Sequence, residues 1–131
     1  MIVDTDVFIW YLRGRREAAD FLDELDPVQL SAVSYMELVH GMRNADELRS
    51  LRGTLRTGRW QVLPITEAIT TRAMTYVEAH FLSRSLQMAD ALIAATCIEQ
   101  GERLATGNIK HFGMIPELSL QPFHIEDSRS S

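Results

Sequence analysis

The chain has 131 residues, of which 46% are hydrophobic and 24% are charged. This length fits one domain with one core, and the composition argues against a disordered, collagen-like or membrane-embedded protein. With 13 Lys and Arg against 18 Asp and Glu, the net charge is −5, opposite in sign to that of most nucleic-acid-binding proteins. One cysteine excludes an internal disulfide, and four scattered histidines leave no zinc-ligand spacing.

No segment of the sequence reads as a membrane span or a leader. The longest nearly apolar stretch, residues 88–98, contains an acid and is far shorter than the roughly 20 residues that cross a bilayer. The opening residues MIVDTDVF carry two acids and no basic segment, unlike a secretory signal. We therefore expect a cytoplasmic protein with no membrane partner.

Short apolar runs alternate with segments of helical periodicity along the chain. The first run ends at Asp4-Thr5-Asp6, and the apolar residues that follow recur at helical spacing. An alanine-rich segment that is apolar nearly all round ends at Gly101. The pattern predicts strands at 1–3, 28–33, 61–65, 103–106 and 122–125, and helices at 7–12, 17–25, 34–42, 48–55, 66–80, 86–100 and 108–112.

Strands that alternate with helices predict a parallel sheet with helices on both faces. The expected fold class is α/β: a three-layer α/β/α domain with a central, mainly parallel sheet of four to five strands. We expect the domain to span residues 1–125 and the six polar residues 126–131 to form a tail. In such folds ligands bind beyond the carboxyl ends of the strands.

Three acids from separate segments fall near that predicted edge. Asp4 follows the first strand, Glu37 lies in the first turn of the helix after the second strand, and Asp90 lies near the start of the alanine-rich helix. Carboxylates brought together repel one another, and a divalent cation such as Mg²⁺ or Mn²⁺ is the usual compensation. These three acids are therefore candidate metal ligands and catalytic residues.

Each acid also has an ordinary structural explanation. Asp4 and Asp6 are typical helix N-caps, and Ser34 with Glu37 matches the capping box. Asp90 is the most informative, because a lone acid on an otherwise buried face is costly unless it is paired, solvated or bound to a metal. The sequence leaves capping and metal binding open for Asp4 and Glu37, and favours a functional role for Asp90.

Four segments carry a resemblance to a known family: IVDTDVFIWYL, SAVSYMELVHGM, ADALIAATCIEQG and LATGNIKHFGMI, spread over residues 2–115. In order and spacing they resemble the PIN domains, and among them the VapC-type toxins of toxin–antitoxin pairs. The resemblance implies a PIN-like fold and a metal-dependent endoribonuclease, in which Asp4, Glu37 and Asp90 bind Mg²⁺ or Mn²⁺ and activate water for attack on an RNA phosphodiester. It also implies a homodimer and a cognate VapB-type antitoxin that inhibits the enzyme.

Four polar residues would support the implied site. Thr5 and Thr106 match hydroxyl residues of the family. Asp6 stands where the family often has Asn or Ser, and is either an additional outer acid or a helix cap. Asn108 stands where many members have a fourth acid. Because an amide contributes no charge, we expect one firmly bound metal ion.

Several basic residues are candidate RNA contacts. Four arginines follow at steps of three, four and three residues: Arg49, Arg52, Arg56 and Arg59. On a helix they would form one stripe that either grips the RNA backbone or pairs with nearby acids. Arg13 and His111 are further candidates near the expected active edge.

The antitoxin would need an apolar groove, and the first two helices supply candidates that fit a core equally well: Phe8, Ile9, Tyr11, Leu12, Phe21 and Leu22. Two other functions stay open. Ile2-Val3-Asp4-Thr5-Asp6 also resembles the first motif of haloacid-dehalogenase-like phosphatases, but the only lysine, Lys110, follows Asp90 instead of preceding it. A PIN-like binding module without catalysis is supported by Asn108 and opposed by the three acids.

Overall fold

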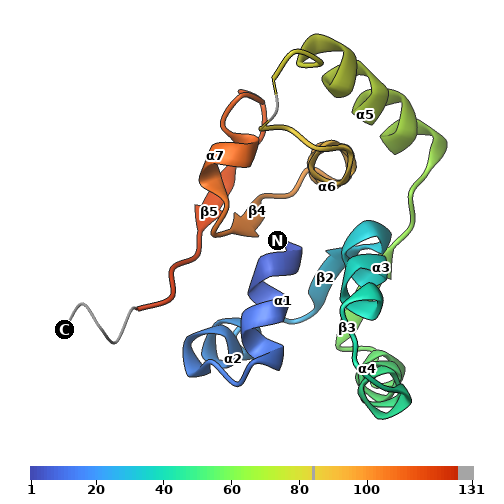
Figure 1. The fold of residues 1–131 in the computed structure, drawn as a ribbon, viewed down its shortest axis with the longest axis vertical. Helices are drawn as coiled ribbons and strands as arrows, with labels where there is room; N and C mark the ends of the chain where they lie inside the picture. Colours follow the sequence, from blue (N-terminus) through green and yellow to red (C-terminus); the bar gives the residue numbers. More distant parts are fainter. Residues whose placement is uncertain (84, 127–131) are drawn as a thin grey trace.

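The computed structural model describes residues 1–83 and 85–126. Its strands and helices run in the order β1 (Ile2–Val3), α1 (Thr5–Leu12), α2 (Arg16–Asp23), β2 (Val28–Ser31), α3 (Ala32–His40), α4 (Ala45–Arg56), β3 (Trp60–Leu63), α5 (Glu67–Ala79), α6 (Met88–Gln100), β4 (Leu104–Thr106), α7 (Ile109–Phe112) and β5 (Leu120–Pro122) (Figure 1). Strands and helices thus alternate along most of the chain, as the sequence pattern predicts.

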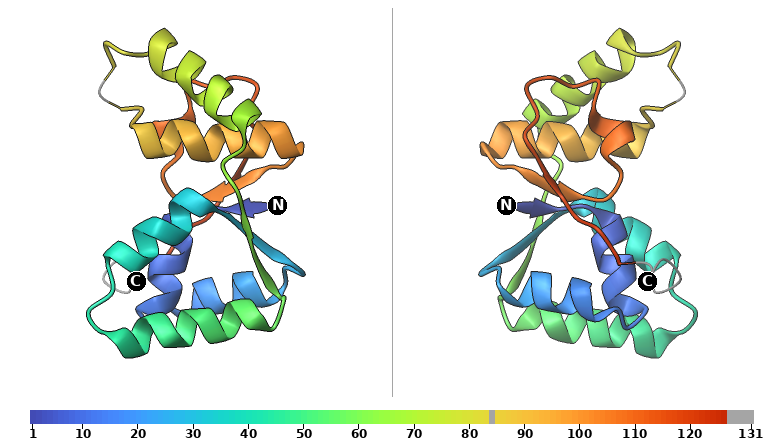
Figure 2. Two further views of the ribbon diagram at one scale, coloured as in Figure 1. Left: turned by 90° about the vertical axis from the view of Figure 1, so that its right-hand side faces the viewer. Right: turned by 90° about the vertical axis from the view of Figure 1, so that its left-hand side faces the viewer.

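The five strands form one sheet in the order β3-β2-β1-β4-β5, and each neighbouring pair is parallel. β1 lies in the middle, between β2 and β4. Figure 2 shows the sheet between two layers of helices, with α5 and α6 on one side and α1, α2 and α4 on the other. The predicted three-layer α/β/α fold with a mainly parallel sheet is confirmed.

Each face of the sheet has its own apolar core. Ile2 and Leu104 belong to the core under α5 and α6. Val3 and Ala105 belong to the core under α1, α2 and α4. This alternation follows from strand geometry, because successive side chains point to opposite faces. β1 and β4 are therefore buried on both faces, and the residues that directly follow them are held in place.

Helix α3 begins two residues earlier than predicted. The Ser31 hydroxyl accepts from the Val33 N–H at 3.0 Å, so Ser31 is the N-cap and Ala32 the first helical residue. Ser34 lies fully buried inside the helix. The capping box predicted for Ser34 and Glu37 is therefore wrong, and the Glu37 side chain is not engaged at the start of its helix.

Strand β5 also begins earlier than predicted, at Leu120 instead of Pro122. It pairs with β4 so that Leu104 faces Leu120 and Thr106 faces Pro122. The prediction over 122–125 followed the apolar residues Phe123 and Ile125, which pack into the core beyond the end of the strand. Hydrophobicity alone does not separate a paired strand from a buried connection.

The predicted tail at 126–131 lies outside the described residues except for Glu126. Its carbonyl accepts from Arg15 at 2.8 Å, and its N–H donates to Glu17 at 3.2 Å. Within residues 1–83 and 85–126, none of the helices has the length and apolar character that crossing a membrane requires.

Candidate active site

The candidate site lies at the point where the order of the strands reverses. β2 and β3 are added on one side of β1, and β4 and β5 are added on its other side. The carboxyl ends of β1 and β4 therefore form the topological switch point, where parallel sheets of this kind bind ligands. Asp4 directly follows β1, and Thr106 is the last residue of β4.

Asp4 is both a helix cap and a member of this site. Its side chain is 4% exposed. Oδ1 accepts the N–H of Thr5 at 2.8 Å, which makes Asp4 the N-cap of α1. Oδ2 accepts the hydroxyl of Thr106 at 2.7 Å, across from β4. The cap predicted for Asp4 is confirmed, and it uses one carboxylate oxygen while the other lies toward β4.

Burial of Asp4 has an electrostatic cost. Desolvation is the main cause that raises its pKa from 3.8 to about 7, and the charges of Asp6 and Asp90 raise it further, against the two hydrogen bonds that lower it. Asp6 and Asp90 therefore both lie within electrostatic range of Asp4. Such a carboxylate is ionised easily only when a positive charge compensates it.

Glu37 is joined to the same site through a hydroxyl. The Thr5 hydroxyl donates to Glu37 Oε1 at 2.7 Å and lies 2.9 Å from the Ser34 hydroxyl oxygen. Because the Thr5 N–H binds Asp4, Thr5 connects the first two acids of the predicted set. Ser34 was assigned to capping in the sequence; only its place inside the helix shows that it supports Thr5.

Asp90 approaches from the start of α6. Its Oδ2 accepts the N–H of Gln87 at 3.0 Å and lies 3.6 Å from His111 Nδ1. Burial raises the pKa of Asp90, as does the charge of Glu37 to a lesser extent, whereas Gln87 and His111 lower it. Asp90 thus binds the N-cap residue of its own helix and lies within electrostatic range of Glu37.

The turn after β4 supplies the remaining supporting groups. Asp6 Oδ2 accepts the N–H of Gly107 at 2.9 Å. The N–H of Asn108 donates to the Thr106 hydroxyl oxygen at 2.9 Å. Because Asp4 is the N-cap of α1, Asp6 is not a helix cap. Gly107 was missed in the sequence, although a glycine between a strand and the next polar residue is a recognisable sign of close packing.

The donor set fits a hard divalent cation. The groups are carboxylates and hydroxyls, and the buried Asp6 Oδ1 has no hydrogen-bond partner in the structure. In the described part of the chain, none of the hydrogen bonds or ion pairs of Asp4, Asp6, Glu37 and Asp90 goes to Lys or Arg. Within the same residues, no three His, Cys, Asp or Glu side chains already form a metal cage. These oxygen donors are the type that a hard cation prefers, but among the described residues they are not arranged as a preformed metal site.

The predicted arginine stripe is shorter than expected. Arg49, Arg52 and Arg56 are exposed on α4, and Arg49 pairs with Asp46 at 2.6 Å. Arg59 lies beyond the helix and donates to the carbonyls of residues 22, 23 and 25, so its place in the stripe is wrong. Arg13 ends α1, with its guanidinium 5.5 Å from the ring of Trp10.

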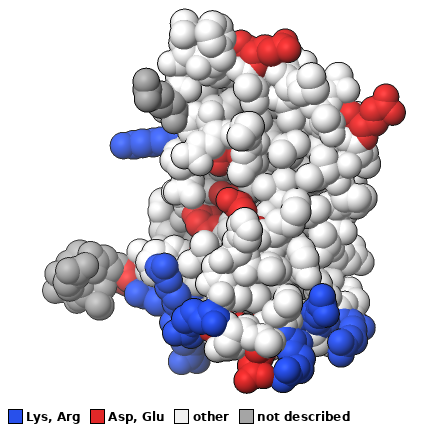
Figure 3. Space-filling model, turned by 45° about the vertical axis from the view of Figure 1, so that its right-hand side comes forward, with Lys and Arg blue, Asp and Glu red and all other residues white. Residues whose placement is uncertain are grey.

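Figure 3 shows how charge is distributed over one face of the molecule. Acidic side chains gather in a hollow at mid-height, and most of the visible Lys and Arg side chains lie below it. Acidic and basic side chains thus occupy largely separate areas of this face, although the chain as a whole is acidic.

A groove of about 760 Å³, lined by both apolar and polar side chains, lies between α1, α3 and α4. Ile9, Tyr11 and Leu12 line it from α1, and Glu37 of the candidate site is also part of its wall. The other predicted groove residues do not take part: Phe8 and Leu22 are buried, and Phe21 packs on Phe123 with 5.4 Å between ring centroids. The groove therefore runs along α1, α3 and α4, not between the first two helices.

Comparisons with known proteins agree with this architecture. Ribonuclease VapC10 of Mycobacterium tuberculosis is 36% identical over 133 residues, covering 98% of this chain and 97% of that protein. Ribonuclease VapC19 of the same organism is 33% identical over 125 residues, covering 89% and 95%. Among solved structures, a toxin–antitoxin complex from Klebsiella pneumoniae has a TM-score of 0.73 at 27% identity, covering 95% and 98%. VapBC-1 of nontypeable Haemophilus influenzae has a TM-score of 0.74 at 26% identity, covering 92% and 96%.

Fold and site together define a single α/β domain with a carboxylate site at the switch point of a parallel sheet. The chain belongs to the PIN domain family, whose model matches residues 1–113. The resemblance seen in the sequence is therefore confirmed, and the haloacid-dehalogenase alternative is set aside.

Proposed function

We propose that this protein is the toxin of a VapBC-type type II toxin–antitoxin system, a metal-dependent endoribonuclease that hydrolyses RNA phosphodiester bonds and is inhibited by a cognate antitoxin. The observation that carries the proposal is Asp4, a buried carboxylate at the switch point that is linked to Glu37 and Asp90 without a basic partner. The names of the 36% and 33% identical relatives support the ribonuclease activity. We place its action in the cytoplasm.

Asp4, Glu37 and Asp90 are the proposed ligands of one Mg²⁺ or Mn²⁺ ion and the proposed catalytic residues. When bound, the ion supplies a Lewis acid that lowers the pKa of a water molecule and offsets charge on the phosphate. The chain's own part is to keep the oxygens aimed: Thr106 holds Asp4, and Thr5 holds Glu37. The exposed Asn108 adds no charge to this set.

The RNA would reach this site along the basic surface. Arg13, Arg52 and Arg56 have exposed side chains, and Arg49 is exposed although it pairs with Asp46. His111 beside Asp90 lies nearest to the scissile phosphate in this proposal. Phosphate contacts of this type supply sequence-independent affinity, so they leave the identity of the RNA target open.

The antitoxin is proposed to occupy the groove of α1, α3 and α4. Its apolar wall suits an amphipathic helix, and Glu37 in the same wall connects the groove to the catalytic acids. Structural neighbours named as toxin–antitoxin and VapBC complexes support this partner. Leu12→Asp, which puts a charge in the groove, is expected to abolish coelution with the antitoxin while cleavage persists; unchanged coelution would contradict the assignment.

A homodimer is also proposed. The large apolar side chains at the end of α5 and the start of α6 are exposed in the single chain: Phe81 at 74%, Leu82 at 83% and Met88 at 75%. Burial of such a patch by a second copy would remove it from water. Sedimentation of wild type against Phe81→Ser with Leu82→Ser is expected to show a dimer and a monomer.

The proposal is tested by incubating total cellular RNA with the purified protein in Mg²⁺, Mn²⁺ or EDTA and mapping new 5′ ends. Discrete 5′-phosphate ends that require metal and disappear in Asp90→Asn are expected. Asp20→Asn is the matched control, because Asp20 is an exposed acid on α2. Cleavage that survives EDTA or Asp90→Asn would contradict the mechanism. Absent cleavage by a folded, metal-binding protein would favour the inert binding module.

A further inference from the structure

The turn after β4 is held by the first turn of α1. Thr106 donates to Asp4 at 2.7 Å, and Gly107 donates its N–H to Asp6 Oδ2 at 2.9 Å. Alternate residues at the start of α1 thus bind consecutive residues of the turn. The same turn leads through Asn108, whose carbonyl accepts the N–H of His111, into α7.

Gly107 is required by space and not by its backbone conformation. A Cβ placed on it would lie 2.8 Å from Asp6 Oδ2 and 3.1 Å from the carbonyl oxygen of Phe123. Gly107 is not among the glycines with positive φ, which are Gly14, Gly58 and Gly101. The turn is therefore clamped between an α1 side chain and the backbone that follows β5.

Asp6 lies in the first turn of α1, where burial raises the pKa of its carboxyl and nearby backbone N–H groups lower it, but Asp6 is not the N-cap of the helix. Asp4 caps α1. Asp6 Oδ1 is buried and unpaired within the described residues. Burial of an unpaired polar atom costs free energy, so this placement of Asp6 destabilises the fold, and another purpose of the carboxylate would explain it. Asp6 therefore holds the turn through Oδ2 alone.

We propose that Asp6 is a positioning residue for the catalytic site, which holds Gly107 by hydrogen bond and by close fit and so fixes Thr106, Asn108 and His111 relative to the acids. This inference rests on the proposed function. In this role Asp6 needs an acceptor oxygen and a side chain of the right size, but it does not need its negative charge. Asn should therefore replace it, whereas Ala should not.

Steady-state cleavage of a defined RNA substrate separates these roles. Asp6→Ala is expected to lower kcat by about tenfold or more and to leave KM within about twofold, as outer partners of metal ligands typically do. Asp6→Asn is expected to stay within a few-fold of wild type. Equal loss in both variants would overturn the proposal and assign Asp6 a role that needs its charge.

The close fit is tested by a double-mutant cycle. Gly107→Ala should lower kcat because its methyl group meets Asp6 Oδ2, and Asp6→Ala should relieve part of that clash, so the double variant is no worse than Gly107→Ala. Multiplicative losses would overturn the coupling. Gly53→Ala is the matched control, because nothing lies within 4 Å of a Cβ at Gly53, and it should keep wild-type kcat.

Amide hydrogen exchange tests the same contact without activity. The Gly107 amide should exchange slowly in wild type and Asp6→Asn, and about tenfold faster in Asp6→Ala, because its acceptor is removed. Equal exchange in all three proteins would overturn the proposal. If this pattern appears while wild type cleaves no RNA, the contact stands and the proposed function fails. If wild type and Asp6→Ala cleave equally, the positioning role fails and the proposed function stands.

Discussion

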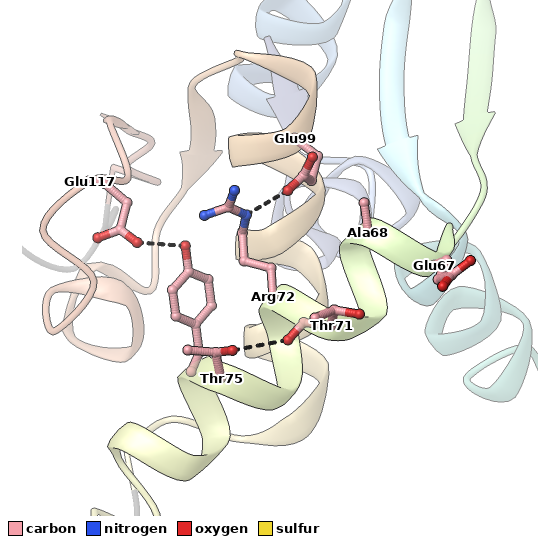
Figure 4. A pocket seen from close by; sticks show the side chains of 8 residues that line it. Glu67, Ala68, Thr71, Arg72, Thr75, Glu99 and Glu117 are labelled. Carbon is pink, nitrogen blue, oxygen red and sulfur yellow. Dashed lines mark hydrogen bonds and ion pairs between the residues drawn. The ribbon is translucent and has the colours of Figure 1, made fainter.

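Two groups of acids in this protein are treated in opposite ways. On the outer surface around α5, Glu99 of α6 binds Arg72 at 2.7 Å, and Glu117, between α7 and β5, accepts the hydroxyl of Tyr76 at 2.7 Å (Figure 4). The Tyr76 hydrogen bond is the main cause that lowers the pKa of Glu117. At the carboxyl edge of the sheet, burial instead raises the pKa of Asp4 to about 7.

The difference teaches which acids serve the fold. At the outer surface Arg72 supplies a positive charge: it pairs with Glu99, and its charge also lowers the pKa of Glu117. The edge acids are held by neutral hydroxyl and amide groups, and their mutual repulsion is left for a cation to relieve. Uncompensated negative charge in a well-packed region therefore coincides with the proposed functional site.

The largest expected effect comes from removing one edge carboxylate. Asp4→Asn keeps the size of the side chain but removes a metal ligand, and we expect RNA cleavage to fall by about a thousandfold or more, equivalent to about 4 kcal/mol of transition-state stabilisation. Single-turnover cleavage with saturating Mn²⁺ measures it. Glu117→Gln at the outer surface should stay within about twofold. Comparable losses in both would erase the distinction between the two groups.

The next largest effect is expected in the pH dependence of stability, which should differ between the edge acids and the outer acids. Because the pKa of Asp4 is about 7 in the fold and 3.8 ordinarily, the folded protein keeps a proton that the unfolded chain releases. Without metal, wild type should therefore lose stability relative to Asp4→Asn as pH rises from about 4 to about 7, by up to about 4 kcal/mol. Urea unfolding of both proteins between pH 4 and pH 8 measures this difference. Parallel curves would contradict a destabilising Asp4.

Metal binding should restore the stability that is lost through the acids at the carboxyl edge of the sheet, and it should not depend on the outer acids. Mn²⁺ at a hundredfold excess over its Kd should stabilise wild type by about 2.7 kcal/mol, because it binds the folded state. Asp90→Asn should gain much less. Glu99→Gln, which removes an outer acid, should respond like wild type. Thermal unfolding with and without Mn²⁺ supplies the comparison, and an equal response of Asp90→Asn would show that the ion binds elsewhere.

The smallest expected effect lies at the outer surface. Arg72→Ala breaks a half-exposed ion pair with Glu99, and such pairs contribute about 0.5 kcal/mol. Cleavage should be unchanged, and urea unfolding should shift slightly. A loss of cleavage here would mean that the two groups are coupled through α6.

Much of the fold and part of the site follow from local sequence. Apolar runs that end at Asp4 and Thr106 identify β1 and β4, and the rule for parallel sheets places both ends at one edge. The acids Asp4, Glu37 and Asp90 are predictable because a carboxylate next to a buried run is costly. Their roles as metal ligands stay predictions.

What escaped prediction depends on contacts between distant segments. Asp6 and Gly107 are 101 residues apart in the sequence. No local sequence pattern predicts the register between β1 and β4 that brings them together. The groove was misplaced for the same reason, because α4 closes it from another part of the chain. Arg59 continued a helical spacing, but Gly58, with φ of +80°, follows the end of α4 and turns the chain away.

The central position of β1 has a consequence for synthesis of the protein. β1 is made before its neighbour β4, and the Thr106 hydroxyl that holds Asp4 follows Asp4 by more than a hundred residues. A ribosome-bound chain that lacks this last third has an open edge beside β1 and only part of the acid set. The proposed nuclease is therefore incomplete until β4 has been synthesised and has paired with β1.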